Sequence, residues 1–383
     1  MKISIITVTY NCASTIEKTL KSVVSQDYSD IEYVVIDGAS TDGTKDIIEK
    51  YLDGITYYCS EKDGGIYDAM NKGIKNTTGD VVLFLNGDDS FIDNYVIGNI
   101  VNKFDNNPHA EIIIGKESIN GRLSDKYDPD RDISLYVDVF FPHQATFAKK
   151  YLYEKIGGFD NTYRISADYD WILRAYSNGV SIMWVDDVVS VFKSGGRSAS
   201  IECVTEEFLI SKKYLNLVGD TNLYQLANEH YGKEFCDIFM WEQINNADYD
   251  VVVEEALALH INKGRRLTNW GAGINGKALC RFLRDNHLEV SCFYDSDISK
   301  FGQVINGVAV KEYCGADCYI IISSKDHEDE IARILSEKGL VEYNDFMRFS
   351  TFARTIVKSI FNRHAICKKF YMRTNLNVPE YIT

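Results

Sequence analysis

The feature that most constrains the fold is an alternation of short apolar runs with helical patterns over residues 1–115. This alternation is typical of βαβ units and of a largely parallel sheet. A helix is expected over Ser14–Gln26, where Ser14 and Glu17 have the spacing of a capping box. The predicted strands are Ile3–Thr9, Ile31–Ile36, Ile55–Cys59, Val81–Leu85 and Ile112–Ile114.

Polar turn clusters follow the predicted strands, with the sequences TYNCAS, DGASTDG, SEKDGG and NGDDS. In an open α/β sheet, ligands bind at the edge where parallel strands reach their carboxyl ends. These loops are therefore the candidate site.

Acidic residues occupy successive loops of this kind: Asp37, Asp63, and Asp88 with Asp89. Four acids at one edge repel one another unless a cation offsets their charge. Mg²⁺ or Mn²⁺ is the natural partner, because such ions bind one or two carboxylates together with substrate phosphates. The pattern favours a nucleotide diphosphate ligand, whose leaving charge a cation stabilises. Alternatively, NGDD and Asp37-Gly38 are simple turns and Asp63 only caps the next helix.

Composition excludes several classes of function. A formal net charge of −15 argues against a nucleic-acid surface, which needs clustered Lys and Arg. Nine cysteines without a CxxC pair are expected to be reduced thiols, which places the protein in the cytoplasm. No apolar run approaches the ~18 residues of a membrane span, so any membrane contact is expected to be peripheral, on the inner face.

Four segments are expected along the chain. Residues 1–200 form the first α/β domain, 201–264 a helical connector, 265–346 a second, small Rossmann-like domain, and 347–383 a basic amphipathic tail. From Arg348 to Arg373 the tail contains seven Lys or Arg and no acid. Residues 350–373 are expected either to lie on anionic lipid or to dock on the acidic body of the same protein.

The second domain contains a G-x-G-x-x-G pattern between a predicted strand, Arg266–Trp270, and a helix. Its glycines are Gly271, Gly273 and Gly276, and Asp295 follows about 20 residues later, the layout of a dinucleotide site. The strand is short and polar, and no catalytic pair follows it. An organising or ligand-sensing module is therefore favoured over an oxidoreductase that binds NAD or another nucleotide.

The first half of the chain resembles the family 2 glycosyltransferases, which have the GT-A fold. The resemblance covers residues 1–200 and implies a mixed α/β sheet flanked by helices. The stretch SEKDGGIYDAMNKG resembles the branch that builds bacterial O-antigen and capsule repeat units. The motifs that carry the resemblance are SIITVTYN, QDYSDIEYVVIDGASTDGT, SEKDGGIYDAMNKGI, GDVVLFLNGDD, HQATF and ADYDWILR.

The resemblance implies a nucleotide site made by residues from several loops. Its predicted members are Thr9, Tyr10 and Asn11 around the base and ribose, Asp37 on the base, and Asp63 and Asn71 facing the nucleotide.

The same resemblance assigns the reacting groups. Asp88 would lie towards the ribose and Asp89 would coordinate Mn²⁺ or Mg²⁺, while Asp168 would act as the base. His143 and Gln144 would line the acceptor side. Met70 stands where many members have Arg, so Lys193 or Arg197 is an alternative contact for the diphosphate.

The implied activity is inverting transfer of a sugar from a nucleotide donor, with UDP expected, to a glycan hydroxyl on a lipid-linked intermediate. A carboxylate that removes the hydroxyl proton accelerates such a reaction by ~10²–10⁴. A sugar nucleotidyltransferase is one rival, but TYNCAS lacks the Gly-rich, Arg-containing loop of that class. A nucleotide-sugar-binding regulatory protein is another, and the intact acids Asp88, Asp89 and Asp168 argue against it.

Overall fold

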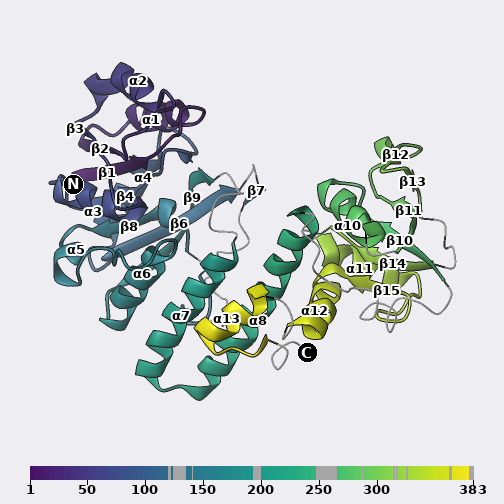
Figure 1. The fold of residues 1–383 in the computed structure, drawn as a ribbon. Coiled ribbons are helices and arrows are strands. Elements are labelled where there is room, and N and C mark those ends of the chain that lie inside the picture. The colour runs from purple at the N-terminus through teal and green to yellow at the C-terminus, as the bar shows by residue number, and fades with distance from the viewer. Residues whose placement is uncertain are drawn as a thin grey trace. The chain divides into compact units, whose positions relative to one another are not determined.

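The chain forms two compact units, Met1–Ala227 and Asn228–Thr383, and the division falls within the long helix α8 (Thr221–Asn246) (Figure 1). Within the described residues, no helix is both long and apolar enough to cross a membrane. The computed structural model describes residues 1–119, 122–123, 135–139, 141–192, 200–246, 265–285, 288–313, 315, 318–324, 327–361 and 365–378.

The first unit is built on a mixed sheet whose strand order is β3-β2-β1-β4-β8-β6-β9-β5, with β7 paired to β6. Its parallel part confirms the predicted βαβ units, with β1, β2, β3 and β4 in parallel pairs. The antiparallel strand β8 joins β4 to β6, and β9 runs parallel to β6. The strands are β1 (Ile3–Thr9), β2 (Ile31–Asp37), β3 (Tyr57–Ser60), β4 (Val81–Phe84), β5 (Ser90–Phe91), β6 (Ile112–Ile119), β7 (Arg122–Leu123), β8 (Thr146–Lys149) and β9 (Ile182–Phe192).

Helices cover both faces of this sheet because side chains along each strand alternate between them. Ile3 and Ile5 of β1 belong to a core that includes α1 and α4, whereas Ile6 and Val8 belong to one that includes α3, α6 and α7. The helical elements are α1 (Ile16–Val24), α2 (Thr44–Ile48), η1 (Glu49–Gly54), α3 (Ile66–Lys75), α4 (Val96–Asn106), η2 (His143–Ala145), α5 (Tyr151–Lys155), α6 (Ala167–Ser177) and α7 (Ile201–Val218).

The predicted capping box at the start of α1 is wrong. The helix begins at Ile16, its N-cap is Thr15, and no side chain caps it. The Thr15 hydroxyl instead donates to the carbonyl oxygen of Gly87 at 2.9 Å. The Thr15 side chain thus contacts the loop after β4 and does not cap the helix.

The second unit contains a sheet of order β12-β13-β11-β10-β14-β15, in which only β12 is antiparallel to its neighbour among the described strands. The predicted strand Arg266–Trp270 is confirmed as β10. Because β10 lies between β11 and β14, later strands are added on both sides of β10, as in doubly wound sheets. The other elements are α10 (Ile274–Asp285), β11 (Val290–Tyr294), η4 (Ile298–Lys300), β12 (Val304–Ile305), β13 (Val308–Lys311), β14 (Cys318–Ile322), α11 (Glu328–Glu337) and β15 (Phe346–Arg348).

The basic tail forms α12 (Phe349–Ile360) and α13 (Ala365–Thr374), and most of its described apolar side chains are buried, although Tyr371 and Met372 of α13 are exposed. The rings of Phe235 and Phe370 are centred 4.1 Å apart, and those of Trp241 and Phe349 4.0 Å apart. This packing favours docking on the protein over an apolar face turned to lipid. The segment boundaries at residues 200, 264 and 346 stay predictions.

Candidate active site

Asp168 lies in the first turn of α6, where a negative charge is favoured by the helix dipole. Its Oδ1 accepts hydrogen bonds from the Tyr67 hydroxyl at 2.9 Å and from the Tyr169 N–H at 3.0 Å. Its Oδ2 lies 3.5 Å from Nδ1 of His143, and 23% of the side chain stays exposed. Elements α3, η2 and α6 thus hold one carboxylate that solvent or a ligand still reaches.

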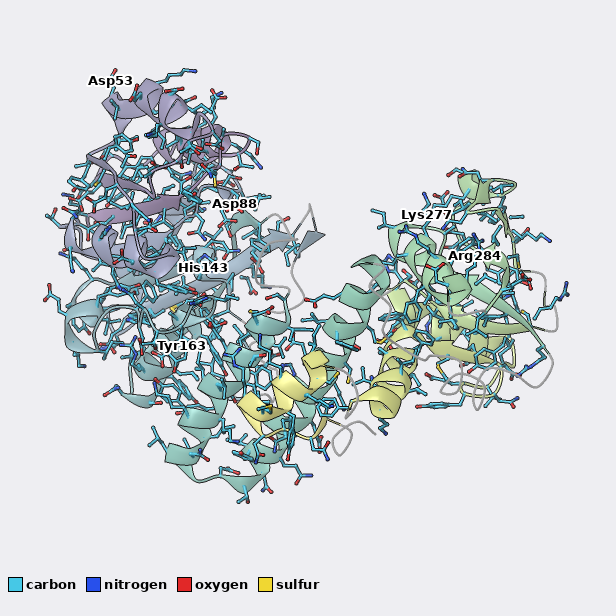
Figure 2. All side chains as sticks on the ribbon, in the orientation of Figure 1. Asp53, Asp88, His143, Tyr163, Lys277 and Arg284 are labelled. Carbon is cyan, nitrogen blue, oxygen red and sulfur yellow. The ribbon has the colours of Figure 1, made fainter. Side chains whose placement is uncertain are left out.

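His143 connects Asp168 to the loop after β4. Its Nε2 lies 2.8 Å from Nδ2 of Asn86. Burial lowers the pKa of His143, although the charges of Asp168 and Asp88 oppose this effect. A lowered pKa favours the neutral ring at physiological pH. Figure 2 labels His143 and Asp88 in the first unit.

Tyr67 is a buried residue of α3, and its hydroxyl faces both Asp168 and the carbonyl oxygen of Ile165. Burial, followed by the charge of Asp168, raises the pKa of Tyr67 well above its ordinary value. The hydroxyl therefore keeps its proton and serves one of these two acceptors at a time.

The loop before Asp168 is fixed by Glu206 of α7, a residue that the sequence did not single out. The Glu206 carboxylate accepts the backbone N–H groups of Arg164 at 3.0 Å, Ile165 at 2.8 Å and Ser166 at 3.2 Å. Charge-assisted bonds of this kind are among the stronger ones in proteins. Glu206 lies far along the chain from the loop, so no local sequence pattern reveals it.

A second set of contacts joins α6 to α7. Asp170 is buried and accepts bonds from Nε of Arg174 at 2.8 Å, Nζ of Lys213 at 2.8 Å and the Tyr214 hydroxyl at 3.0 Å. Because a buried carboxylate needs such partners, these bonds hold α6 in place. Helix α7 thus supports the site and is more than a connector.

The two acids after β4 differ in exposure. Asp88 is exposed, with no hydrogen-bond or ion-pair partner among the described residues. Asp89 is buried, neither carboxylate oxygen has a partner in the described part of the chain, and burial together with Asp88 and Glu117 raises its pKa well above the ordinary value. Asp88 is thus the more accessible of the two acids, whereas the carboxylate oxygens of Asp89 are the ones that have no partner within a buried site.

A complete protein cage for a metal is absent from the described residues, where no three His, Cys, Asp or Glu side chains are grouped to hold an ion. An exposed carboxylate with no internal partner still fits Mg²⁺ or Mn²⁺. Such ions keep several waters and take substrate phosphates as ligands, so one or two acids suffice.

Tyr10 and Asp63, two residues predicted to bind the nucleotide donor, both lie close to Gly38. A Cβ at Gly38 would lie 2.7 Å from Oδ2 of Asp63 and 3.3 Å from the Tyr10 ring, so a larger residue would fill this space. The Tyr10 side chain is 62% exposed and offers a face for stacking. Asp63 also accepts the Gly65 N–H at 3.0 Å, just before α3, but no side chain caps this helix, so the alternative role of Asp63 as a helix cap gains no support.

Asp37 and Asn11 hold the neighbouring loops. Asp37 is fully buried and accepts bonds from Ser40 and Ser60. Asn11 adopts a left-handed backbone, with φ of 52°, and its Oδ1 accepts the Thr41 N–H at 2.9 Å. Their predicted contacts with the base remain predictions. Thr9 is also buried and lies against Gly87.

Asn71 and Gln144 are used internally. Asn71 donates to the carbonyl oxygen of Phe159 at 2.9 Å and to Asn161 at 3.0 Å, so neither amide hydrogen is left for a ligand. Gln144 is 3% exposed and donates to Glu117. Their predicted contacts with nucleotide and acceptor gain no support from this geometry. Lys193 and Arg197 lie outside the described residues.

The predicted ligand loop of the second unit is closely packed. Gly271 has a φ of 117°, and a Cβ at Gly276 would lie 1.7 Å from the Gly271 carbonyl oxygen, whereas Gly273 has open space. The Asp295 carboxylate accepts the Ala272 N–H at 2.7 Å. It also accepts bonds from the Asp297 N–H at 2.9 Å and the Lys300 ammonium at 3.1 Å. A ligand at this loop stays a prediction.

The comparisons with known proteins define the class of the first unit. The family model "Glycosyl transferase family 2" matches residues 4–166. An uncharacterized glycosyltransferase of Mycobacterium tuberculosis is 34% identical over 185 residues, 45% of this chain and 68% of that protein. A PGL/p-HBAD biosynthesis glycosyltransferase of Mycobacterium bovis is 33% identical over 214 residues, 54% of this chain and 82% of that protein.

The fold comparison agrees with this class. The crystal structure of TarS from Staphylococcus aureus is similar with a TM-score of 0.51 and 22% identity, over 68% of this chain and 48% of the TarS chain. The first unit is thus a GT-A glycosyltransferase fold. The chain belongs to glycosyl transferase family 2 and is a glycosyltransferase.

Proposed function

We propose that this enzyme transfers a sugar, with inversion, from a nucleoside diphosphate donor to a hydroxyl of a saccharide acceptor. UDP is the nucleotide we would test first. The observation that carries the proposal is the Asp168 carboxylate, which is partly exposed and is oriented by Tyr67 and His143. A carboxylate held this way is suited to accept a proton from an incoming hydroxyl.

The reaction balances as a single displacement. The acceptor oxygen bonds to the anomeric carbon while the bond from that carbon to the diphosphate breaks. The electron pair leaves with the diphosphate, and the hydroxyl proton moves to Asp168. Attack from the face opposite the leaving group inverts the anomeric configuration, as in inverting glycosidases.

The leaving diphosphate needs charge stabilisation. We propose Asp88 as the direct ligand of Mg²⁺ or Mn²⁺ and Asp89 as a second, supporting acid. Asp88 is placed first because it is exposed, whereas Asp89 is buried. When bound, the cation would stabilise the charge on the departing diphosphate.

The acceptor is proposed to be a lipid-linked intermediate of a surface polysaccharide, handled at the cytoplasmic face of the membrane. Support comes from the sequence resemblance and from exposed basic residues of α13, Lys368, Lys369 and Arg373. Replacing these three residues with Gln should reduce co-sedimentation with liposomes that contain anionic lipid. Unchanged sedimentation would remove the membrane contact from the proposal.

The function is tested by release of free nucleoside diphosphate from UDP-, GDP- and dTDP-sugars with Mn²⁺ or Mg²⁺ and a panel of saccharide acceptors. NMR of the product should show an anomeric configuration opposite to that of the donor. Retention of configuration would contradict the proposed single displacement. Failure of every donor to bind in thermal-shift titrations would contradict the donor class.

A further inference from the structure

We infer that His143, held by Asn86, is a positioning residue that keeps the Asp168 carboxylate aimed for proton removal. This inference rests on the proposed function. It adds a chain of contacts that orients the proposed base, from Asn86 in the loop after β4 through the His143 ring to Asp168. Asn86, His143 and Asp168 are far apart in the sequence, and the fold brings them together.

The first step of the argument is the tautomer of His143. Its Nδ1 faces a carboxylate oxygen at 3.5 Å, and its Nε2 faces an amide nitrogen at 2.8 Å. A neutral ring has one N–H and one lone pair. A lone pair on Nδ1 would point at the negative charge of Asp168, so the proton belongs on Nδ1. Nε2 is then the acceptor of an N–H from Asn86.

The second step is the role of Asn86. An amide nitrogen donates and cannot accept, so its contact with Nε2 matches the tautomer that the Asp168 carboxylate requires, with the proton on Nδ1. Second partners of this kind fix the orientation of an imidazole ring. Asn86 lies two residues after Phe84, the end of β4, and its side chain is only partly exposed, which limits its movement.

The third step concerns the capacity of Asp168. An ionised carboxylate offers about four lone-pair sites. One oxygen faces Tyr67 and the Tyr169 N–H, and the other faces His143. The remaining capacity is available to the acceptor hydroxyl. The 3.5 Å contact is long, and catalytic contacts of this kind tighten when substrate binds.

The charged and titratable groups around the pair come from several elements. Those that act on His143 are Asp168 and Asp88, and burial opposes protonation of the ring. Those near Asp168 are His143 of η2, Tyr67 of α3 and Cys203 of α7. Burial raises the pKa of both Tyr67 and Cys203, so neither carries charge at neutral pH. Among these groups, His143 is the one whose Nδ1 can either donate a hydrogen bond to Asp168 or, in the other tautomer, not donate one.

The test uses two substitutions at one position. In His143→Asn the amide lies near the position of Nδ1 and can still donate to Asp168. In His143→Gln the longer side chain carries its amide nearer to the position of Nε2, where it meets Asn86. Full pH–rate profiles, kcat and KM for the donor, and donor binding by thermal shift are measured on the full chain, with Asp168→Asn as reference.

We expect His143→Gln to lower kcat about tenfold and to move the acid limb of the pH–rate profile upward, because the carboxylate loses a hydrogen-bond donor that favours its charged form. His143→Asn should recover most of both effects, and donor KM should stay the same in each variant. Equal losses in both variants with an unmoved acid limb would overturn the inference, because a packing role predicts that result.

The reference variant separates two kinds of failure. Loss of turnover in Asp168→Asn, with an unmoved pH profile in His143→Gln, would leave the proposed base in place and reject the positioning role. Full turnover in Asp168→Asn would reject the base itself, and with it the proposal that His143 acts through it.

Discussion

Asp88 and Asp295 make an informative pair, because each follows a parallel strand at the carboxyl edge of an α/β sheet, one in each unit. Asp88 is exposed and has no partner among the described residues. Asp295 is 8% exposed and accepts bonds from Ala272, Asp297 and Lys300. The carboxyl edges of two sheets thus hold one acid that is open to a ligand and one that is already satisfied.

The difference arises from what the following loop supplies. After β11 the loop brings Lys300 within 3.1 Å of Asp295, which neutralises its charge. After β4 the neighbour of Asp88 is another acid, Asp89, which is buried. An uncompensated pair of acids attracts a cation, whereas a paired acid stabilises its own loop. Strand-end position alone therefore does not identify a ligand site.

The largest effect is expected at Asp168, the proposed base. Asp168→Asn keeps the size of the side chain but removes its basicity, so kcat should fall by ~10²–10⁴ with donor binding retained. Stopped assays of nucleoside diphosphate release would measure it. The matched control is Asp53→Asn, an exposed acid in η1 labelled in Figure 2, for which we expect wild-type turnover.

The next effect tests whether Asp88 is open for a cation. Asp88→Ala should lower metal-dependent kcat by ~10²-fold, because several kcal/mol of charge stabilisation is lost. Titration of Mn²⁺ at fixed donor concentration should show weaker apparent cation affinity. If Asp89→Ala alone weakens the cation while Asp88→Ala does not, the order of the two acids is reversed.

The opposite edge of the first sheet offers a satisfied acid whose effect is on stability. Desolvation alone would raise the pKa of Glu32, but bonds from Ser4, Thr78 and Lys2 outweigh it and lower the pKa to about 2, from 4.5. A lowered folded-state pKa stabilises the fold above pH 4.5, and this contribution is lost as the pH falls towards 2.

Glu32→Gln should therefore destabilise the first unit by about 3 kcal/mol at neutral pH and by much less near pH 2. Urea unfolding followed at several pH values measures this difference. Glu154→Gln, at an exposed position of α5, is the matched control. A pH-independent loss at position 32 would mean that packing, and not ionisation, accounts for the effect.

The smallest effect tests the second unit. Asp295→Asn weakens the bond to Lys300 and should destabilise the second unit by about 1 kcal/mol. Turnover should not change, because Asp295 is engaged within its own loop. Hydrogen exchange of β10 and β11 amides would report the local loss. A large fall in kcat would show that Asp295 takes part in the reaction, and would contradict its description as an acid that is satisfied within its own loop.

The sequence predicted the strands well because their apolar runs are local. Ile3–Thr9 and Arg266–Trp270 coincide with β1 and β10. It also placed Asp88 and Asp168 in the loops and helix where they lie. Local patterns failed where distant partners decide the outcome. Thr15 bonds to the loop after β4 in place of a cap at Ser14.

The same physical reason explains what sequence reasoning missed at the site. Asn71 has a polar side chain that could bind a ligand, yet its amide is hydrogen-bonded to the backbone of Phe159. Gln144 is likewise taken by Glu117. Glu206 gave no signal, since its partners are backbone N–H groups that any sequence provides.

The bonds from Glu206 and Lys213 to the loop and helix around Asp168 bear on how this enzyme can be divided or recombined. A piece ending near residue 200 would keep every described strand of the first sheet and still lack the Glu206 carboxylate and the Lys213 ammonium, which hold the surroundings of the proposed base. A chimera that exchanges donor specificity should for this reason carry α7 with α6 as one inherited block, with its junction placed after Val218.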